Sequence, residues 1–158
     1  MTLMRRRLTI LSVIYVVPGF LFAQPSEPPS PLTVEGIREW QKTGVLEPWK
    51  QWPKEIKLDV CGDRRPELFL ATGGFSRGMS YALFTLKGSS WRLIAEEVDC
   101  TAGMVDVLSD EHHGYHDFVA FQRSGRGGFF VRVFSWNGQK YTPKADWELS
   151  YNSLYDRE

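Results

Sequence analysis

The three histidines of the chain lie within five residues of one another, at His112, His113 and His116. Neutral imidazoles at this density are typical ligands of zinc or copper, and a closed site needs about four ligands. The cluster is therefore a candidate metal-binding loop, which would serve a small metal-dependent hydrolase. We favour a solvated hairpin loop, because Gly114 interrupts the cluster and strand-like residues follow Asp117.

Acidic residues recur at every fourth position in Asp59, Asp63 and Glu67. Calcium takes about six to eight oxygen ligands, and carboxylates in a tight loop supply several of them. This spacing makes the segment a candidate calcium loop that backbone carbonyls and water would complete. We favour an ordinary turn, in which Asp63 bonds its own backbone and Glu67 pairs with a neighbouring arginine.

Two glycine- and arginine-rich segments, 73–78 and 123–128, are a third candidate, and we call them the two Gly/Arg loops. Arginine side chains from two adjacent hairpin loops would bind a carboxylate or a sulfate, which indicates a recognition surface. Neither loop has the glycine and lysine order of a phosphate-binding loop. Flexible hairpin tips are the alternative. The predicted binding residues are Arg77, Arg126, Phe75 and Phe129.

The chain carries few signs of catalysis. It has no G-x-S-x-G nucleophile elbow and no H-E-x-x-H zinc motif. Glu96 and Glu97 are adjacent, so they would point to opposite faces of a strand and make a poor acid–base pair. We therefore expect a noncatalytic protein without a cofactor, unless calcium occupies the acidic loop.

The first 23 residues predict a secretory signal peptide. Arg5, Arg6 and Arg7 precede an almost wholly apolar run, Leu8 to Phe22, and the small residue Ala23. This is the layout of a cleaved signal. The run is shorter than the roughly 20 residues that a helix needs to span a bilayer. An uncleaved N-terminal anchor is the alternative, and in either case the protein is expected in the periplasm or outside the cell.

Export bears on the charge and on the cysteines. Loss of the signal removes three of the 19 basic residues, which leaves 16 against 19 acidic residues. Such a chain has no excess of positive charge with which to bind nucleic acid. Cys61 and Cys100 would enter an oxidising compartment, so a structural disulfide between them is expected.

The rest of the chain divides into four segments. A proline-rich linker spans 24–31, a short helix and a tryptophan-rich stretch span 32–55, a β domain spans 56–146, and an aromatic tail spans 147–158. Within the β domain, a shift of 50 residues brings similar residues into register. The matched pairs are Gly78 with Gly128, Phe84 with Phe134, Gly88 with Gly138 and Trp91 with Tyr141. We expect an all-β, antiparallel fold of two repeated four-stranded meander units with a short N-terminal helix.

The segment 59–71 reads DVCGDRRPELFLA, and 110–120 is a looser copy. It resembles the D-x-x-G-D-x-x-P-E-L-hydrophobic signature of FG-GAP and related VCBS-like, integrin-type repeats. The resemblance implies units like the blades of a β-propeller, an acidic loop that binds calcium, and protein or carbohydrate partners. This chain holds two such units.

Together these features predict an exported binding module without catalytic activity, which recognises a protein or a carbohydrate through the two Gly/Arg loops. Two alternatives stay open. One is a metal-dependent small hydrolase that uses the histidine loop, and the other is a periplasmic inhibitor of a secreted hydrolase. We expect no nucleic-acid partner and no membrane span after cleavage. Open sheet edges would also permit a dimer.

Overall fold

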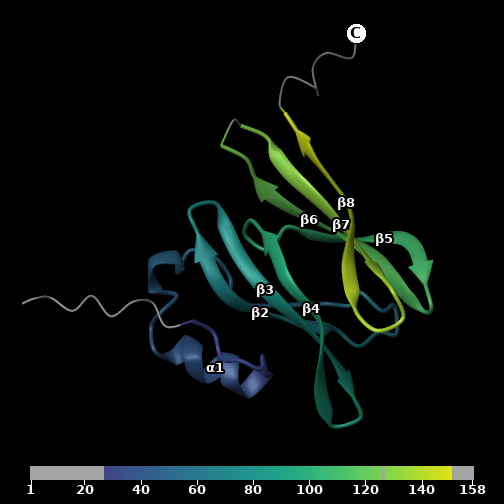
Figure 1. Cartoon of the computed structure of the whole chain (residues 1–158), viewed down its shortest axis with the longest axis horizontal. Helices are drawn as coiled ribbons and strands as arrows, with labels where there is room; N and C mark the ends of the chain where they lie inside the picture. The colour runs from purple at the N-terminus through teal and green to yellow at the C-terminus, as the bar shows by residue number, and fades with distance from the viewer. Residues whose placement is uncertain (1–26, 126, 151–158) are drawn as a thin grey trace, which may run out of the picture.

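The computed structural model describes residues 27–125 and 127–150, which form two antiparallel sheets and one short helix (Figure 1). Each strand pairs with the next along the chain, β1 to β4 in the first sheet and β5 to β8 in the second. The elements are α1 Val34–Lys42, a 3-10 turn Glu47–Trp49, β1 Glu55–Leu58, β2 Glu67–Phe75, β3 Gly78–Lys87, β4 Ser90–Cys100, β5 Val105–His112, β6 Tyr115–Arg123, β7 Phe129–Trp136 and β8 Tyr141–Leu149. The predicted fold, two four-stranded antiparallel meanders with a short helix, is confirmed.

The 50-residue repeat of the sequence is also a repeat of strand pairing. Leu68 lies opposite Phe84 in the first sheet, and Phe118 lies opposite Phe134 in the second. The same shift relates the β3–β4 and β7–β8 pairs, which both break register immediately before that phenylalanine of β3 or β7. Two units that share even an irregularity of register are copies of one structural plan.

The two sheets use opposite faces of the repeated four-stranded unit where they pack on each other. Successive side chains of a strand point to opposite faces of the sheet, so Leu68 and Phe69 lie on different faces. Phe69 faces the second sheet, and its ring meets that of Phe118 edge to face at 5.9 Å between centroids. Phe118 is the repeat counterpart of Leu68, not of Phe69. The two units therefore stack in the same orientation, with one face of the first sheet packed on the opposite face of the second.

Helix α1 covers the face of the first sheet that points away from the second (Figure 1). The hydroxyl of Thr33 caps the helix by accepting a hydrogen bond from the Gly36 N–H at 3.1 Å. Val34 and Ile37 lie on one face of the helix and are buried against Leu68 and its neighbours. Within the part of the chain that the structure describes, no helix is long and apolar enough to cross a membrane.

Phe69→Ala tests whether the contact between the sheets stabilises the whole fold. The Phe69 side chain is fully buried, so its loss leaves a cavity and should lower the free energy of unfolding by about 3–5 kcal/mol. Leu86→Ala is the control, because Leu86 is 40% exposed and its loss should change stability by less than about 0.5 kcal/mol. Urea unfolding of both variants measures the difference, and similar losses in the two variants would contradict this packing.

Candidate functional site

The predicted calcium ligands Asp59 and Asp63 hold the loop between β1 and β2 in shape. The Asp59 carboxylate accepts hydrogen bonds from the Gly62 N–H at 2.7 Å and the Arg64 N–H at 2.8 Å. Asp63 accepts one from the Arg65 N–H at 2.8 Å. Such bonds from a carboxylate to the backbone a few residues ahead are what aspartate supplies in turns.

Glu67, the third predicted calcium ligand, points into the protein. It is 2% exposed and accepts hydrogen bonds from the Val60 N–H at 2.9 Å and the Thr85 hydroxyl at 3.0 Å. The Cys61 N–H and thiol also donate to it, at 3.3 and 2.9 Å. A buried carboxylate needs such donors, because an unpaired charge in the interior is costly. Glu67 thus ties the loop to the start of β2.

The histidine cluster forms the tight hairpin between β5 and β6. His113 and Gly114 both have positive φ, 56° and 80°, which is the backbone of a two-residue hairpin turn. His112 Nε2 lies 3.5 Å from Asp117 Oδ2. His116 packs against Gly62 so closely that a Cβ there would lie 2.8 Å from its Nε2. Two of the three histidines therefore face different neighbours.

Asp117 is the repeat counterpart of Glu67 and is also buried, at 1% exposure. Lys144 Nζ donates to it at 3.1 Å. Among residues 27–125 and 127–150, no three His, Cys, Asp or Glu side chains gather closely enough to hold a metal ion. The geometry therefore gives no support to a calcium site at Asp59, Asp63 and Glu67 or to a zinc or copper site at the histidines.

The predicted disulfide between Cys61 and Cys100 is wrong, since both thiols are free. The Cys61 thiol binds Glu67, which begins β2, whereas Cys100 lies opposite Met79, which itself pairs with Gly74 near the end of β2. Seven residues of strand, at about 3.3 Å each, separate the two places by roughly 20 Å. The Cα atoms of a disulfide lie within about 7 Å of each other.

Both thiols are held in the protonated form. Burial raises the pKa of Cys100 to about 12. Burial also raises the pKa of Cys61 far above its ordinary value, and the hydrogen bond to the Glu67 carboxylate raises it further. Because the thiolate is the reactive form of cysteine, these raised pKa values disfavour a nucleophilic role for either thiol.

The two Gly/Arg loops lie side by side, as the tips of the β2–β3 and β6–β7 hairpins (Figure 1). Thr101, which is 4% exposed, joins them. Its hydroxyl donates to the Arg77 carbonyl and accepts from the Arg123 N–H at 2.8 Å. Its own N–H donates to the Phe121 carbonyl at 2.8 Å. This residue, directly after β4, fixes the relative positions of the two loops.

Arg77 is in contact with the neighbouring loop. A Cβ at Gly125 would lie 2.4 Å from its Nη2, so the guanidinium rests on the Gly125 backbone. Arg126 lies outside the described residues. The Phe75 ring folds back over its own hairpin toward Gly78, and Phe129 packs with Phe121 at 6.5 Å between centroids. The loops are thus adjacent, as expected, but their aromatic rings are used in packing.

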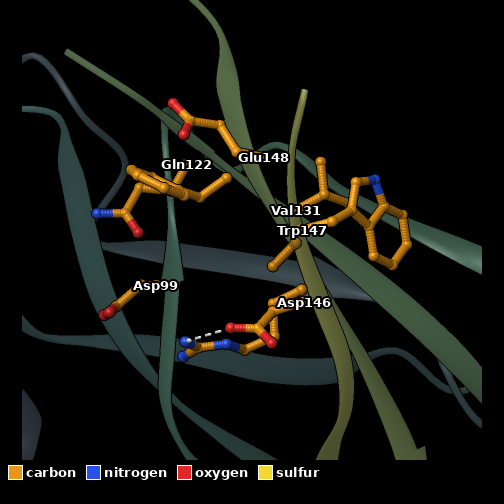
Figure 2. Close-up of a pocket in the computed structure, with 9 residues that line it drawn as sticks. Asp99, Gln122, Val131, Asp146, Trp147 and Glu148 are labelled. Atoms are coloured by element: carbon orange, nitrogen blue, oxygen red, sulfur yellow. Dashed lines mark ion pairs between the residues drawn. The ribbon is translucent and has the colours of Figure 1, made fainter. Parts of the chain in front are cut away.

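A cleft opens beside the Gly/Arg loops, between β4 of the first sheet and the facing side of the second sheet (Figure 2). Its volume is about 260 Å³. Its polar walls carry carboxylates, an amide and a guanidinium, and Figure 2 shows Asp99 across the hollow from Gln122 and Glu148. The residues that line it and matter below are Asp99, Gln122, Phe130, Arg132, Asp146 and Glu148.

Sequence reasoning missed this cleft and Thr101. Asp99 and Glu148 lie near the ends of the fourth strands of their units. The repeat offered the one usable signal, since it predicts that the ends of these two strands are equivalent. How far apart two sheets stand is not encoded in such a pattern.

No protein-family model, no curated protein and no solved structure matches this chain. The resemblance to FG-GAP repeats therefore stays a prediction that rests on the segment 59–71 and its looser copy. What the protein does must be argued from the geometry of its own residues.

The raised thiol pKa values predict that the protein loses stability in alkali. A thiol in an unfolded chain has a pKa of about 8.5, so between about pH 9 and pH 12 the unfolded chain releases protons that the folded protein keeps. The free energy of unfolding should therefore fall as the pH rises through this range. Cys61→Ser keeps a donor for Glu67 but removes one titrating group, so its decline should be shallower. Urea unfolding at about pH 7, 9 and 10.5 measures both, and equal slopes would refute the assignment.

Proposed function

We propose that this chain is an exported, noncatalytic binding module that contacts its partner with the end of the molecule where the two Gly/Arg loops lie. The observation that carries the proposal is the bridge at Thr101, which holds two loops from different repeats in one arrangement beside an open cleft. Loops that a rigid scaffold positions are where proteins most often place recognition. A protein or a carbohydrate would bind at this surface.

A noncatalytic role agrees with the state of the reactive side chains. The thiols of Cys61 and Cys100 are protonated and buried or half-buried. His112 faces Asp117, and His116 packs on Gly62. These contacts favour a structural role for the hairpin over the metal-dependent hydrolase. An inhibitor of a secreted hydrolase would be one kind of binding module, and partner capture would identify it.

The relation to FG-GAP repeats belongs to the same proposal. Propellers stack four-stranded antiparallel sheets, and these two sheets pack through opposite faces of one plan, as neighbouring blades do. Helix α1 closes one end of this short stack. The chain would then be a two-unit relative of such repeats, adapted to bind without closing a ring.

Export is proposed from the N-terminal segment, which lies outside the described residues. The free thiols fit an oxidising compartment because their raised pKa values and burial keep them from reacting. The mature protein would carry three more acidic than basic residues. We place it in the periplasm or outside the cell.

Arg77→Ala tests the recognition surface. The substitution removes the guanidinium that rests on the Gly125 backbone, so it should weaken capture of a partner by about threefold or more while the melting temperature stays within a few degrees. Lys57→Ala is the control, because Lys57 is an exposed cation on the short edge strand β1. The measurement is quantitative capture from the exported fraction of the source cells, together with a glycan array. Equal capture by both variants and the wild type would remove the loops from the binding surface.

Cleavage of the signal gives a separate test of export. When the full chain is expressed in a bacterial host, the protein recovered from the periplasm should begin at Gln24, because Ala23 is the small residue at the end of the apolar run. N-terminal sequencing and intact mass report the first residue. Recovery of the full-length chain in the membrane fraction would instead establish the uncleaved anchor.

A further inference from the structure

The cleft beside the Gly/Arg loops differs from its counterpart in the first repeat in one informative way. In the first sheet, Ser80 lies opposite Asp99 and its hydroxyl donates to the Asp99 carboxylate. The counterpart of Ser80, 50 residues on, is Phe130, which lies opposite Glu148. The second repeat therefore has an aromatic ring, Phe130, where the first has the hydroxyl of Ser80. Glu148 has no hydroxyl opposite it that could donate a hydrogen bond, as Ser80 donates to Asp99.

This exchange leaves two groups exposed toward one hollow. The Phe130 side chain is 44% exposed, although most large apolar side chains of the chain's described part are buried. The Glu148 carboxylate forms no hydrogen bond or ion pair within the residues that the structure describes. Asp99 reaches the same hollow from the first sheet. An exposed ring next to unpaired carboxylate charge is the surrounding that a cation prefers.

The cleft carries the negative charge that would attract a cation. Its walls carry the carboxylates of Asp99, Asp146 and Glu148 and a single guanidinium, that of Arg132. Arg132 Nη2 lies 3.8 Å from Asp146 Oδ2, so these two charges largely offset each other (Figure 2). Asp99 and Glu148 then leave the cleft with net negative charge. The guanidinium of Arg77, which sequence analysis assigned to an anion, rests instead on the Gly125 backbone.

We propose that this cleft binds the basic side chain of a protein partner, a lysine or an arginine, with Glu148 and Asp99 as counter-ions and the Phe130 ring as the apolar wall. This inference rests on the proposed function, of which it names the ligand chemistry. The volume of about 260 Å³ lies below the usual range for a drug-sized ligand, about 300–1,000 Å³, and suits one long side chain. The adjacent Gly/Arg loops then contact the rest of the partner.

Fluorescence anisotropy with labelled hexalysine, hexaglutamate and a neutral chito-oligosaccharide tests the proposal on the mature protein. Hexalysine should bind, and the other two should not. Glu148→Gln and Phe130→Ala should each weaken hexalysine binding about threefold to fivefold, since each removes one exposed electrostatic contact. The double variant should weaken it about tenfold, and added salt should weaken wild-type binding further.

The control is Glu111→Gln, which removes the same charge from an exposed position on β5, in the hairpin of the histidines. It should leave hexalysine affinity unchanged, and equal losses in Glu111→Gln and Glu148→Gln would overturn the proposal because they would mean attraction by bulk charge only. Binding of hexaglutamate or the oligosaccharide, but not hexalysine, would also overturn it. If partner capture responds to Arg77→Ala while hexalysine does not bind, the ligand chemistry fails and the proposed function stands; if neither occurs, both fail.

Discussion

The contact of Phe69 with Phe118 joins two sheets that follow one plan of strand pairing. Each sheet alone would leave apolar side chains of its inner face in water, because a single four-stranded meander buries only what another layer covers. Packing these unlike faces together buries the apolar side chains of both units in one core. It also means that one outer face of the stack needs a cover, which α1 supplies to the first sheet.

The position of the two sheets follows from polar contacts at one end. The Tyr141 hydroxyl donates to the His116 carbonyl at 2.7 Å and the Val60 carbonyl at 3.3 Å, and the His116 N–H donates to the Val60 carbonyl at 3.1 Å. These bonds hold the histidine hairpin against the loop that Glu67 anchors. At the other end, Thr101 bridges the two Gly/Arg loops, Arg77 rests on Gly125, and the cleft lies beside them. The two sheets are therefore hydrogen-bonded together at the end of the histidine hairpin and separated by the cleft at the end of the Gly/Arg loops.

The strand pairing could be predicted from the sequence because pairing is local and periodic. Glycines, a phenylalanine and a turn that recur at 50 residues specify the same hairpins twice, and the structure repeats the register of Leu68 with Phe84 in Phe118 with Phe134. The burial of Glu67 and Asp117 was not foreseen. Their alignment under the shift is the signal that could have indicated it, because both units have an acidic residue near the start of their second strand.

The disulfide and the binding surface could not be predicted for a different reason. A spacing of 39 residues says nothing about which ends of β2 the two cysteines reach, and export alone favours a disulfide. The arginines pointed to an anion, but contacts between separate hairpins decide where a guanidinium lies, and Arg77 rests on Gly125. The cleft depends on how two sheets diverge, which no local pattern describes. Sites between repeats are therefore the part of this protein that only its three-dimensional structure reveals.

A double-mutant cycle between Phe69 and Phe118 tests the central claim, that the two repeats are stabilised by direct packing on each other. The cycle compares the free energies of unfolding, from urea titrations, of the wild type, Phe69→Leu, Phe118→Leu and the double variant. Buried edge-to-face rings contribute about 0.5–1.5 kcal/mol beyond the area that they bury, so we predict a coupling energy of about 1 kcal/mol. A coupling energy of zero, with each single variant destabilised, would mean that the two sheets are stable independently of this contact and would contradict the account.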